Sequence, residues 1–376
     1  MRKKILICSG GTGGHLYPAL VIIEYIKDNY PISEVLFIGT ERGLGKELIK
    51  GFDVNYKTVK SRGLVLNGSI LKKTMNIVKF LYCLTLGFFQ SFKIVLEFKP
   101  DIILGMGGFS CAPVLSAGIF MGKKIALHEQ NYIPGRLNSF FSKFAKYIFI
   151  SFSDTGKYFK VRKSKIIFSG NPLRKAIRKL KNIRPEFEKW GLEKGRFTIV
   201  AFGGSLGAEK INDTVINLCD YFKGSNNIQI LLICGNRFYS QLERNKNNVI
   251  KSKDKLIFRI FPYINEMQEI YRISDLIISR AGANTISEII ECNIPSILIP
   301  YPYAVANHQF YNADFLARKG KAILIKDKDF DKEKVIEAIK LLVGNNGKKY
   351  KEMKNIEISG SGIDSAGIIT SKLMEC

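Results

Sequence analysis

The chain has three histidines, and each lies where a buried strand is expected to end. His15 closes the glycine loop Ser9–Gly14, His128 opens the segment His128–Asn131, and His308 lies beside Gln309. Imidazole and carboxylate groups are common general bases at neutral pH. In open parallel sheets, ligands bind outside the carboxyl ends of the strands. A single histidine is more often structural, but three in such loops favour a functional site.

Two glycine-rich turns have a sequence that suits phosphate binding. Residues 9–14 (SGGTGG) follow the apolar run Lys4–Cys8, and residues 203–208 (GGSLGA) follow Phe197–Phe202. Glycine lets a ligand approach the backbone closely. A helix start after such a turn offers N–H groups and a partial positive charge to a phosphate. Neither turn has the GxGxxG spacing or a P-loop lysine. We therefore expect no NAD, FAD or ATP, and no cofactor.

Two further segments could bind phosphates or sugars. The loop GMGGFS (105–110) follows an expected strand, although a plain tight turn would have the same composition. The run RAGANT (280–285) opens a helical pattern whose start could face a diphosphate. Glu288, one turn later, could accept hydrogen bonds from ribose hydroxyls, or it could simply be a favourable acid near a helix start.

The elements that must position these loops repeat one pattern in both halves of the chain. Short apolar runs alternate with amphipathic segments such as Leu16–Asp28, Ala208–Asp220 and Thr285–Cys292. Continuous apolar runs are typical of strands buried on both faces, and strand–helix alternation indicates parallel sheets. The expected strands are Lys4–Cys8, Val35–Gly39, Asp101–Leu104, Lys124–Leu127, Tyr147–Ser151, Phe197–Phe202, Ile228–Cys234, Leu256–Phe261, Leu276–Ser279, Ser296–Pro300 and Ala322–Ile325. The pattern predicts an α/β protein of two doubly wound domains that face each other across a cleft.

Composition limits the classes of partner. Of 376 residues, 58 are Lys or Arg and 33 are Asp or Glu, which gives a formal net charge of +25. This surplus suits phosphorylated substrates, an anionic membrane or nucleic acid, or it reflects a lysine-rich surface. We expect no nucleic-acid partner, because the sequence has no long basic block and no recognised binding module. Seven scattered cysteines without a CxxC pair indicate reduced cytoplasmic thiols. Asp327-Lys328-Asp329 spells DxD in a charged turn, and we expect no metal there.

The segment Ile70–Lys99 mixes apolar and basic residues. A core helix or helix pair would explain part of it, and an interfacial face on an anionic membrane would explain the lysines. We expect some of its apolar side chains to be buried and others exposed. Its uncharged stretch, Phe80–Phe92, is too short to span a bilayer.

Seven motifs, in order along nearly the whole chain, resemble the MurG family of bacterial UDP-N-acetylglucosamine:lipid I N-acetylglucosaminyltransferases. They are GGTGGH (10–15), GMGGFSCAP (105–113), HEQNYIPGRLN (128–138), GNPLR (170–174), GGSLGA (203–208), RAGANTISE (280–288) and NHQFYNA (307–313). The resemblance implies the GT-B fold. It also implies an acceptor- and membrane-facing domain over residues 1–173 and a UDP-sugar domain over 174–360. A C-terminal helix at about 361–376 would pack back on the first domain.

The resemblance further implies the reaction and its partners. The enzyme would transfer N-acetylglucosamine from UDP-N-acetylglucosamine to the C4 hydroxyl of lipid I, with inversion, and form lipid II for peptidoglycan synthesis. It would act as a peripheral protein at the cytoplasmic face of the cell membrane, on an anionic surface, beside other cell-wall synthesis proteins.

The same resemblance assigns roles to individual residues. Donor contacts from the second half would come from Ser205, Ile264, Gly282, Ala283, Asn284, Thr285, Ile286, Ser287, Glu288, His308 and Gln309, with Ile264 at the uracil and Glu288 at the ribose. Donor contacts from the first half would come from Thr12, Gly13, Gly14 and Asn131, and Arg174 would add a contact at the domain junction. Gly105, Gly107, Gly108 and Ser110 would receive the acceptor diphosphate.

The chemistry of transfer requires a base and a stabilised leaving group. His15 is the favoured base and Glu129 the second candidate. Helix starts and Arg174 would stabilise the departing UDP. Ala306 stands where many relatives have Asp, and Asn307 is expected to cap the helix that follows. The alternatives are another UDP-sugar transferase, a UDP-N-acetylglucosamine 2-epimerase, a nucleic-acid-binding protein and an inactive scaffold.

Overall fold

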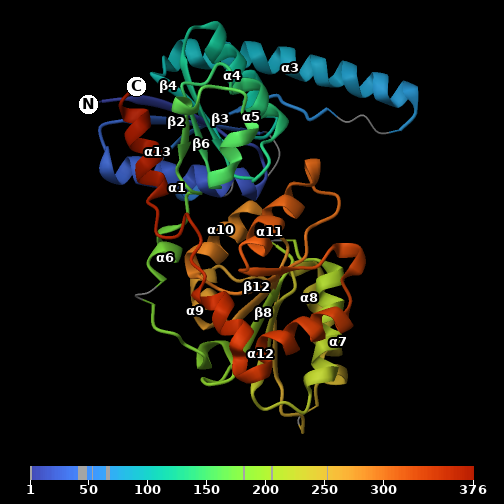
Figure 1. The fold of residues 1–376 in the computed structure, drawn as a ribbon. Coiled ribbons are helices and arrows are strands. Elements are labelled where there is room, and N and C mark those ends of the chain that lie inside the picture. The colour runs from blue at the N-terminus through green and yellow to red at the C-terminus, as the bar shows by residue number, and fades with distance from the viewer. Residues whose placement is uncertain are drawn as a thin grey trace. The chain divides into compact units, whose positions relative to one another are not determined.

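The computed structural model describes residues 2–40, 49–52, 54–64, 68–180, 183–204, 206–251 and 253–376. The chain divides into two compact units (Figure 1). The first contains Met1–Arg174 and Gly362–Cys376, and the second contains Lys175–Ser361.

The first unit is built on a seven-stranded sheet in the order β3-β2-β1-β4-β5-β6-β7. All its strand pairs are parallel. The strands are β1 Lys4–Cys8, β2 Glu34–Thr40, β3 Asn55–Val59, β4 Ile102–Gly105, β5 Lys124–Glu129, β6 Tyr147–Ile150 and β7 Ile166–Phe168. Because side chains alternate along a strand, Ile5 and Ile7 enter one core cluster while Leu6 and Cys8 enter another. The central strands are therefore buried on both faces.

Helices cover both faces of this sheet. They are α1 Gly13–Asn29, α3 Ile70–Phe98, α4 Cys111–Phe120, α5 Arg136–Phe141 and α13 Ser365–Met374, with short 3-10 turns at Ile49–Gly51, Ser153–Tyr158 and Lys163–Lys165. The last helix returns to the first unit, where Ile369 and Leu373 join the core cluster that contains Ile22 of α1. In Figure 1, α13 (red) lies beside α1 (blue).

Helix α3 is docked only through its C-terminal part. Its buried residues are Gly87, Ser91, Ile94 and Val95, and none of residues 70–86 is buried. Gly87 permits this docking, since a Cβ there would lie 2.1 Å from the Lys60 carbonyl oxygen. By length and composition, α3 is long and apolar enough to cross a membrane. The helix extends beyond the uncharged stretch Phe80–Phe92, which by itself is too short to span a bilayer. The expected mixture of buried and exposed side chains is confirmed.

The second unit is built on a six-stranded parallel sheet in the order β10-β9-β8-β11-β12-β13. The strands are β8 Phe197–Phe202, β9 Ile228–Ile233, β10 Ile257–Phe261, β11 Leu276–Ser279, β12 Ser296–Leu298 and β13 Ala322–Leu324. The helices are α6 Lys175–Arg178, α7 Glu209–Phe222, α8 Asn236–Val249, α9 Met267–Ile273, α10 Ala283–Cys292, α11 His308–Arg318 and α12 Lys332–Asn355, with 3-10 turns at Glu188–Trp190, Val305–Asn307 and Asp327–Asp329. The prediction of two parallel α/β domains is confirmed.

Candidate functional site

The glycine loop after β1 leads into α1 and places His15 in the first turn of that helix. Helix α1 begins at Gly13, and its N-cap residue Thr12 is extended and makes no side-chain capping bond. The first N–H groups of a helix have no acceptor within it, so this helix start suits an anion. A Cβ at Gly14 would meet no atom within 4 Å. Thr12, Gly13 and Gly14, which we predict to contact the donor sugar, thus lie next to His15.

The imidazole of His15 rests on a second glycine loop, the one that follows β4. A Cβ at Gly107 would lie 3.0 Å from His15 Cε1 and 3.1 Å from its Nδ1, and Gly107 has φ +97°. Gly10 donates a 2.9 Å hydrogen bond from its N–H to the Gly107 carbonyl oxygen. The two loops therefore form one surface, and the absence of a side chain at Gly107 leaves room for the ring.

The other residues predicted for the acceptor diphosphate have structural contacts. Gly108, at φ +85°, lets its loop approach Gly10, where a Cβ would lie 2.7 Å from the Gly10 Cα. Gly105 ends β4, and a Cβ there would lie 3.1 Å from Leu115. The buried Ser110 hydroxyl donates a 2.8 Å hydrogen bond to the Ser9 carbonyl. Binding of the acceptor by these residues stays a prediction.

Glu129 is buried at the end of β5, and its carboxylate accepts several hydrogen bonds. Oε1 accepts from the Asn131 backbone N–H at 2.9 Å and from its Nδ2 at 3.3 Å. Oε2 accepts from Gly135 N at 3.0 Å and Asn138 Nδ2 at 2.8 Å. A carboxylate engaged in this way braces the loop that carries Asn131. This geometry favours His15 over Glu129 as the base.

His128 and Gln130 form a side-chain hydrogen bond that the sequence motifs did not predict. His128 lies inside β5 with no exposed surface, not in a loop as expected. Its Nδ1 lies 2.9 Å from Gln130 Nε2, and the Oε1 of Gln130 lies 2.9 Å from His15 Nδ1. Burial lowers the pKa of His128 to about 4, which keeps its imidazole neutral. No motif assigned Gln130 a role, because its partners Met106 and His15 come from distant segments.

The start of α10 carries most of the residues predicted for the donor diphosphate. Gly282 is the N-cap, in extended conformation, and Ala283, Asn284 and Thr285 form the first turn. The Ser287 hydroxyl donates a 2.9 Å hydrogen bond to the Ala283 carbonyl. Ile286 has no exposed surface and packs into the unit, so only its backbone could face a ligand. Arg174, the last residue of the first unit, is half-buried.

Two residues predicted at the nucleoside are held in place by the second unit. The Tyr271 hydroxyl donates a 2.7 Å hydrogen bond to Glu288 Oε2. Tyr271 is buried on α9, so it fixes the carboxylate near the start of α10. Ile264, after β10, is 5% exposed. Ser205 lies outside the described residues; its neighbour Gly207, at φ +75°, needs to be glycine because a Cβ would lie 2.0 Å from the Cys234 carbonyl oxygen.

Gln309 joins the loops that follow β11 and β12. Its Oε1 accepts a 3.2 Å hydrogen bond from Ala281 N and a 3.0 Å bond from Tyr301 N. His308, the first residue of α11, has its Nδ1 2.6 Å from the Val305 carbonyl. The expectation that Asn307 caps α11 is wrong, because it lies at φ 54° and makes no side-chain capping bond.

The DxD turn is occupied by ion pairs. Asp327 pairs with Arg280, the residue that opens the α10 loop, and with Lys210 at 3.7 Å. The Arg280 guanidinium also donates to the carbonyls of Ile299 and Pro300. Within the described ranges, no three His, Cys, Asp or Glu side chains gather as metal ligands. This turn therefore braces the loop that opens α10 and the segment that follows β12.

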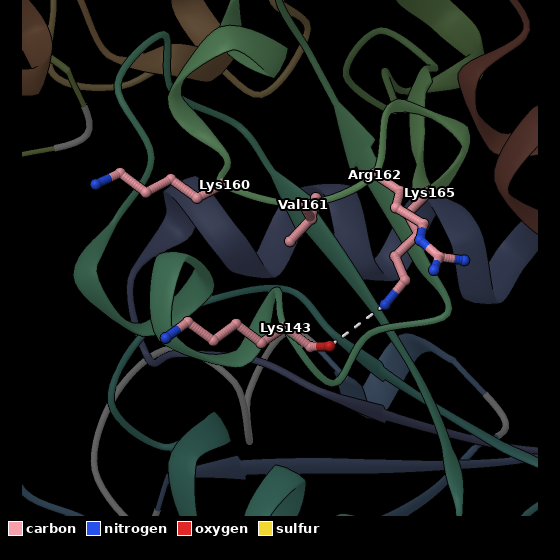
Figure 2. A pocket seen from close by; sticks show the side chains of 5 residues that line it. All are labelled: Lys143, Lys160, Val161, Arg162 and Lys165. Carbon is pink, nitrogen blue, oxygen red and sulfur yellow. Dashed lines mark hydrogen bonds between the residues drawn. The ribbon is translucent and has the colours of Figure 1, made fainter.

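A basic pocket of about 340 Å³ lies in the first unit (Figure 2). It is lined by Lys143, Lys160, Val161, Arg162 and Lys165. The Lys165 ammonium donates a 3.3 Å hydrogen bond to the Lys143 carbonyl. Four cationic residues without a lining carboxylate make this pocket suited to an anion.

Two family models match this chain. Residues 5–150 match the glycosyltransferase family 28 N-terminal domain, and residues 198–364 match the corresponding C-terminal domain. An N-acetylmuramyl-(pentapeptide) pyrophosphoryl-undecaprenol N-acetylglucosamine transferase of Caldanaerobacter subterraneus is 39% identical, over 90% of this chain and 91% of that protein. The Bacillus subtilis protein of the same name is 36% identical over 99% of both chains.

Solved structures share the fold at lower identity. MurG of Acinetobacter baumannii superposes with a TM-score of 0.77 at 22% identity over all of both chains. A UDP-GlcNAc 2-epimerase of Neisseria meningitidis, bound to UDP-GlcNAc, gives 0.67 at 15% identity over 99% of this chain and 100% of that one. The fold is therefore GT-B, and the fold alone does not separate transferase from epimerase.

The two parallel α/β units and the matched domains define the chain as a glycosyltransferase. Within that class, it belongs to glycosyltransferase family 28, whose two domains it contains in order.

Proposed function

We propose that this chain transfers N-acetylglucosamine from UDP-N-acetylglucosamine to lipid I, the undecaprenyl-pyrophosphoryl N-acetylmuramyl pentapeptide, and so makes lipid II. The observation that carries the proposal is the 39% and 36% identity to transferases of that name over at least nine tenths of each chain. The sequence identity to the UDP-GlcNAc 2-epimerase of Neisseria meningitidis is only 15%.

The second unit binds the UDP moiety in this proposal. The N–H groups at the start of α10 stabilise the diphosphate, because a helix start carries a partial positive charge. Glu288, held by Tyr271, accepts hydrogen bonds from the ribose hydroxyls. As the bond between the sugar C1 and the phosphate oxygen breaks, the same N–H groups stabilise the charge that develops on UDP.

His15 of the first unit acts as the general base. The C4 hydroxyl of the acceptor loses its proton to His15 as its oxygen forms the new bond to C1 of the donor sugar. The bond from C1 to UDP breaks on the opposite face, and the configuration at C1 inverts. Fixed hydrogen-bond donors and a positioned base contribute jointly to such a step.

A transfer assay tests this proposal. Purified protein is mixed with labelled UDP-N-acetylglucosamine, with and without a short-chain lipid I analogue. We expect UDP release only with the analogue, and label in the lipid product. Change of configuration at C2 of the donor sugar without UDP release would instead establish an epimerase.

We also propose that the protein binds the cytoplasmic face of an anionic membrane through α3. The exposed half of this helix carries Ile70, Leu71, Met75, Val78 and Leu81, which are 84%, 74%, 50%, 60% and 52% exposed. Lys72, Lys73 and Lys79 lie among them. A helix with exposed apolar residues and lysines suits the boundary between headgroups and acyl chains.

We place α3 on the membrane surface, not across it. Its C-terminal part is docked on the unit through Gly87, Ile94 and Val95. Lysines at positions 72, 73, 79 and 93 run along its length, and each would be costly in the bilayer centre. The basic pocket of Figure 2 adds a place for an anionic headgroup.

Sedimentation with vesicles tests the membrane proposal. We expect binding to vesicles with phosphatidylglycerol and weaker binding to phosphatidylcholine alone. Leu71→Ser with Val78→Ser should weaken binding, whereas Leu341→Ser on α12 should not, although Leu341 is also 57% exposed. Equal sedimentation with both vesicle types would contradict the proposal. No binding to either would point instead to a cell-wall synthesis protein as the partner of α3.

A further inference from the structure

Gln130 connects two histidines through buried hydrogen bonds. Its Oε1 lies 2.9 Å from His15 Nδ1. Its Nε2 lies 2.8 Å from the Met106 carbonyl oxygen and 2.9 Å from His128 Nδ1. The Nε2 of His128 lies 3.2 Å from the Gly170 carbonyl oxygen. Gln130 is 1% exposed and His128 is 0% exposed, so water does not compete for the bonds that these two side chains make with each other, Met106 and Gly170. The bond from Gln130 to His15 is part-buried.

Two backbone carbonyls, those of Met106 and Gly170, fix the direction of each hydrogen bond that links His15, Gln130 and His128. A carbonyl only accepts, so the NH2 group of Gln130 must face Met106 and its Oε1 must face His15. The Gly170 carbonyl likewise requires a proton on Nε2 of His128, and this leaves Nδ1 to accept the second amide hydrogen of Gln130. Since an amide oxygen also only accepts, the proton of neutral His15 lies on Nδ1.

The arrangement depends on a neutral His128. A proton on its Nδ1 would face the amide hydrogens of Gln130 and would force the amide to turn. Burial lowers the pKa of His128 to about 4, and the nearby His15 acts in the same direction. The amide of Gln130 therefore keeps its orientation across the neutral pH range.

The two glycine loops, after β1 and after β4, also contact the ring of His15. Its ring lies against Gly107 and Gly10, where a Cβ would come within 3.0 Å and 3.3 Å of ring atoms. The imidazole thus lies against the backbone of both loops, and its Nδ1 is bound to Gln130. The lone pair at Nε2 is the one left to take a proton.

We propose that Gln130 is a positioning residue, which holds His15 in the Nδ1-protonated tautomer so that Nε2 receives the proton of the acceptor hydroxyl. This inference rests on the proposed function, because transfer requires a base. When Nε2 takes the proton, Nδ1–H remains bonded to Gln130, and the bond from the acceptor oxygen to the sugar forms as UDP leaves. His128 acts indirectly, because its hydrogen bond fixes the orientation of the Gln130 side-chain amide.

The tautomer can be observed directly by NMR of the full-length protein labelled with ¹⁵N-histidine. The chain has three histidines, so substitution of His128 and His308 assigns the signals. We expect wild-type His15 to be protonated on Nδ1, and Gln130→Met to give a mixture with the Nε2-protonated form. Ser142→Ala removes a part-buried hydrogen bond of this unit, from the buried Ser142 hydroxyl to the Ser139 carbonyl, and should leave the tautomer unchanged.

Kinetics then connect the tautomer to catalysis. We expect Gln130→Met to lower kcat by about 10- to 100-fold, in the range seen when an orienting partner of a histidine is lost. The Kd for UDP should stay within twofold, because the second unit binds it. His128→Leu should also lower kcat, and His128→Asn should restore most of it, since its Oδ1 can accept from Gln130 where Nδ1 did.

Separate outcomes test the positioning role of Gln130 and the proposed transferase function. If the wild-type protein is active but His15 is protonated on Nε2, or if Gln130→Met keeps both tautomer and kcat, the positioning role is overturned. If the tautomer is locked but UDP release never depends on the acceptor, the proposed function is overturned instead.

Discussion

The Nε2–H of His128 donates a 3.2 Å hydrogen bond to the carbonyl oxygen of Gly170, which lies 42 residues further along the chain. This bond joins the end of β5 to the segment that follows β7. Burial of this imidazole lowers its pKa to about 4, although the bond to Gly170 acts in the opposite direction. Burial of His128 therefore links the stability of the first unit to pH.

We predict that stability falls as the pH drops from about 6.5 towards 4. In this window the unfolded chain binds a proton at His128 and the folded chain does not, so protonation favours unfolding. A His128 pKa of 6.5 in the unfolded chain and about 4 in the folded protein corresponds to about 3 kcal/mol. Urea unfolding at several pH values measures this. His128→Asn should flatten the dependence, and an unchanged slope in that variant would contradict the assignment.

Lys321 is a buried cation that satisfies the end of a helix. Its ammonium group has no exposed surface and donates to the carbonyls of Met353 at 2.8 Å, Lys354 at 3.2 Å and Ile356 at 3.0 Å. Lys321→Met should lower the free energy of unfolding by about 2 kcal/mol, because these carbonyls lose their donor. Lys319→Met, at an exposed lysine of the same turn, should change it little. Equal urea midpoints for the two variants would exclude this role.

Glu129→Gln separates a bracing role from a catalytic one. An amide can accept hydrogen bonds on one oxygen only, and its NH2 would face donors from Gly135 and Asn138 or from Asn131. We expect a loss of about 2 kcal/mol in stability. We also expect the acidic limb of the pH–rate profile to keep its position. A stable variant with kcat as low as that of a His15 variant would make Glu129 the base.

Tyr271→Phe tests how Glu288 is positioned. Loss of the 2.7 Å hydrogen bond should raise the Kd for UDP about 3- to 10-fold, equivalent to one ordinary hydrogen bond, and leave kcat at saturating donor nearly unchanged. Calorimetric titration with UDP measures the affinity. Tyr221→Phe, on the exposed side of α7, is the matched control. If both variants bind UDP as the wild type does, Glu288 is not held through Tyr271.

The strands that the sequence did not predict are the two edges of the first sheet. Strand β3, Asn55–Val59, alternates polar and apolar residues, with Asn55 and Lys57 exposed. Strand β7, Ile166–Phe168, has only three residues. Central strands are buried on both faces and appear as continuous apolar runs, whereas an edge strand lacks that signal. The central strands carry that signal, and α1, α7 and α10 were predictable from the amphipathic segments between the strands.

The candidate site was predictable to the level of loops but not of contacts. Glycine composition and spacing pointed to the loops around His15 and α10, because helix starts after glycine turns have a local signature. The contacts of Gln130 with Met106 and His15, and that of Tyr271 with Glu288, depend on which segments the sheets bring together. No local pattern carries that information.

The most direct test of the account compares wild-type protein with His15→Ala in acceptor-dependent release of UDP. We predict that the wild type releases UDP only when the lipid I analogue is present. We also predict that His15→Ala lowers kcat by about 10²- to 10⁴-fold while the Kd for UDP stays within twofold, as expected for loss of a general base. A His15→Ala variant that keeps the wild-type kcat would contradict the central claim.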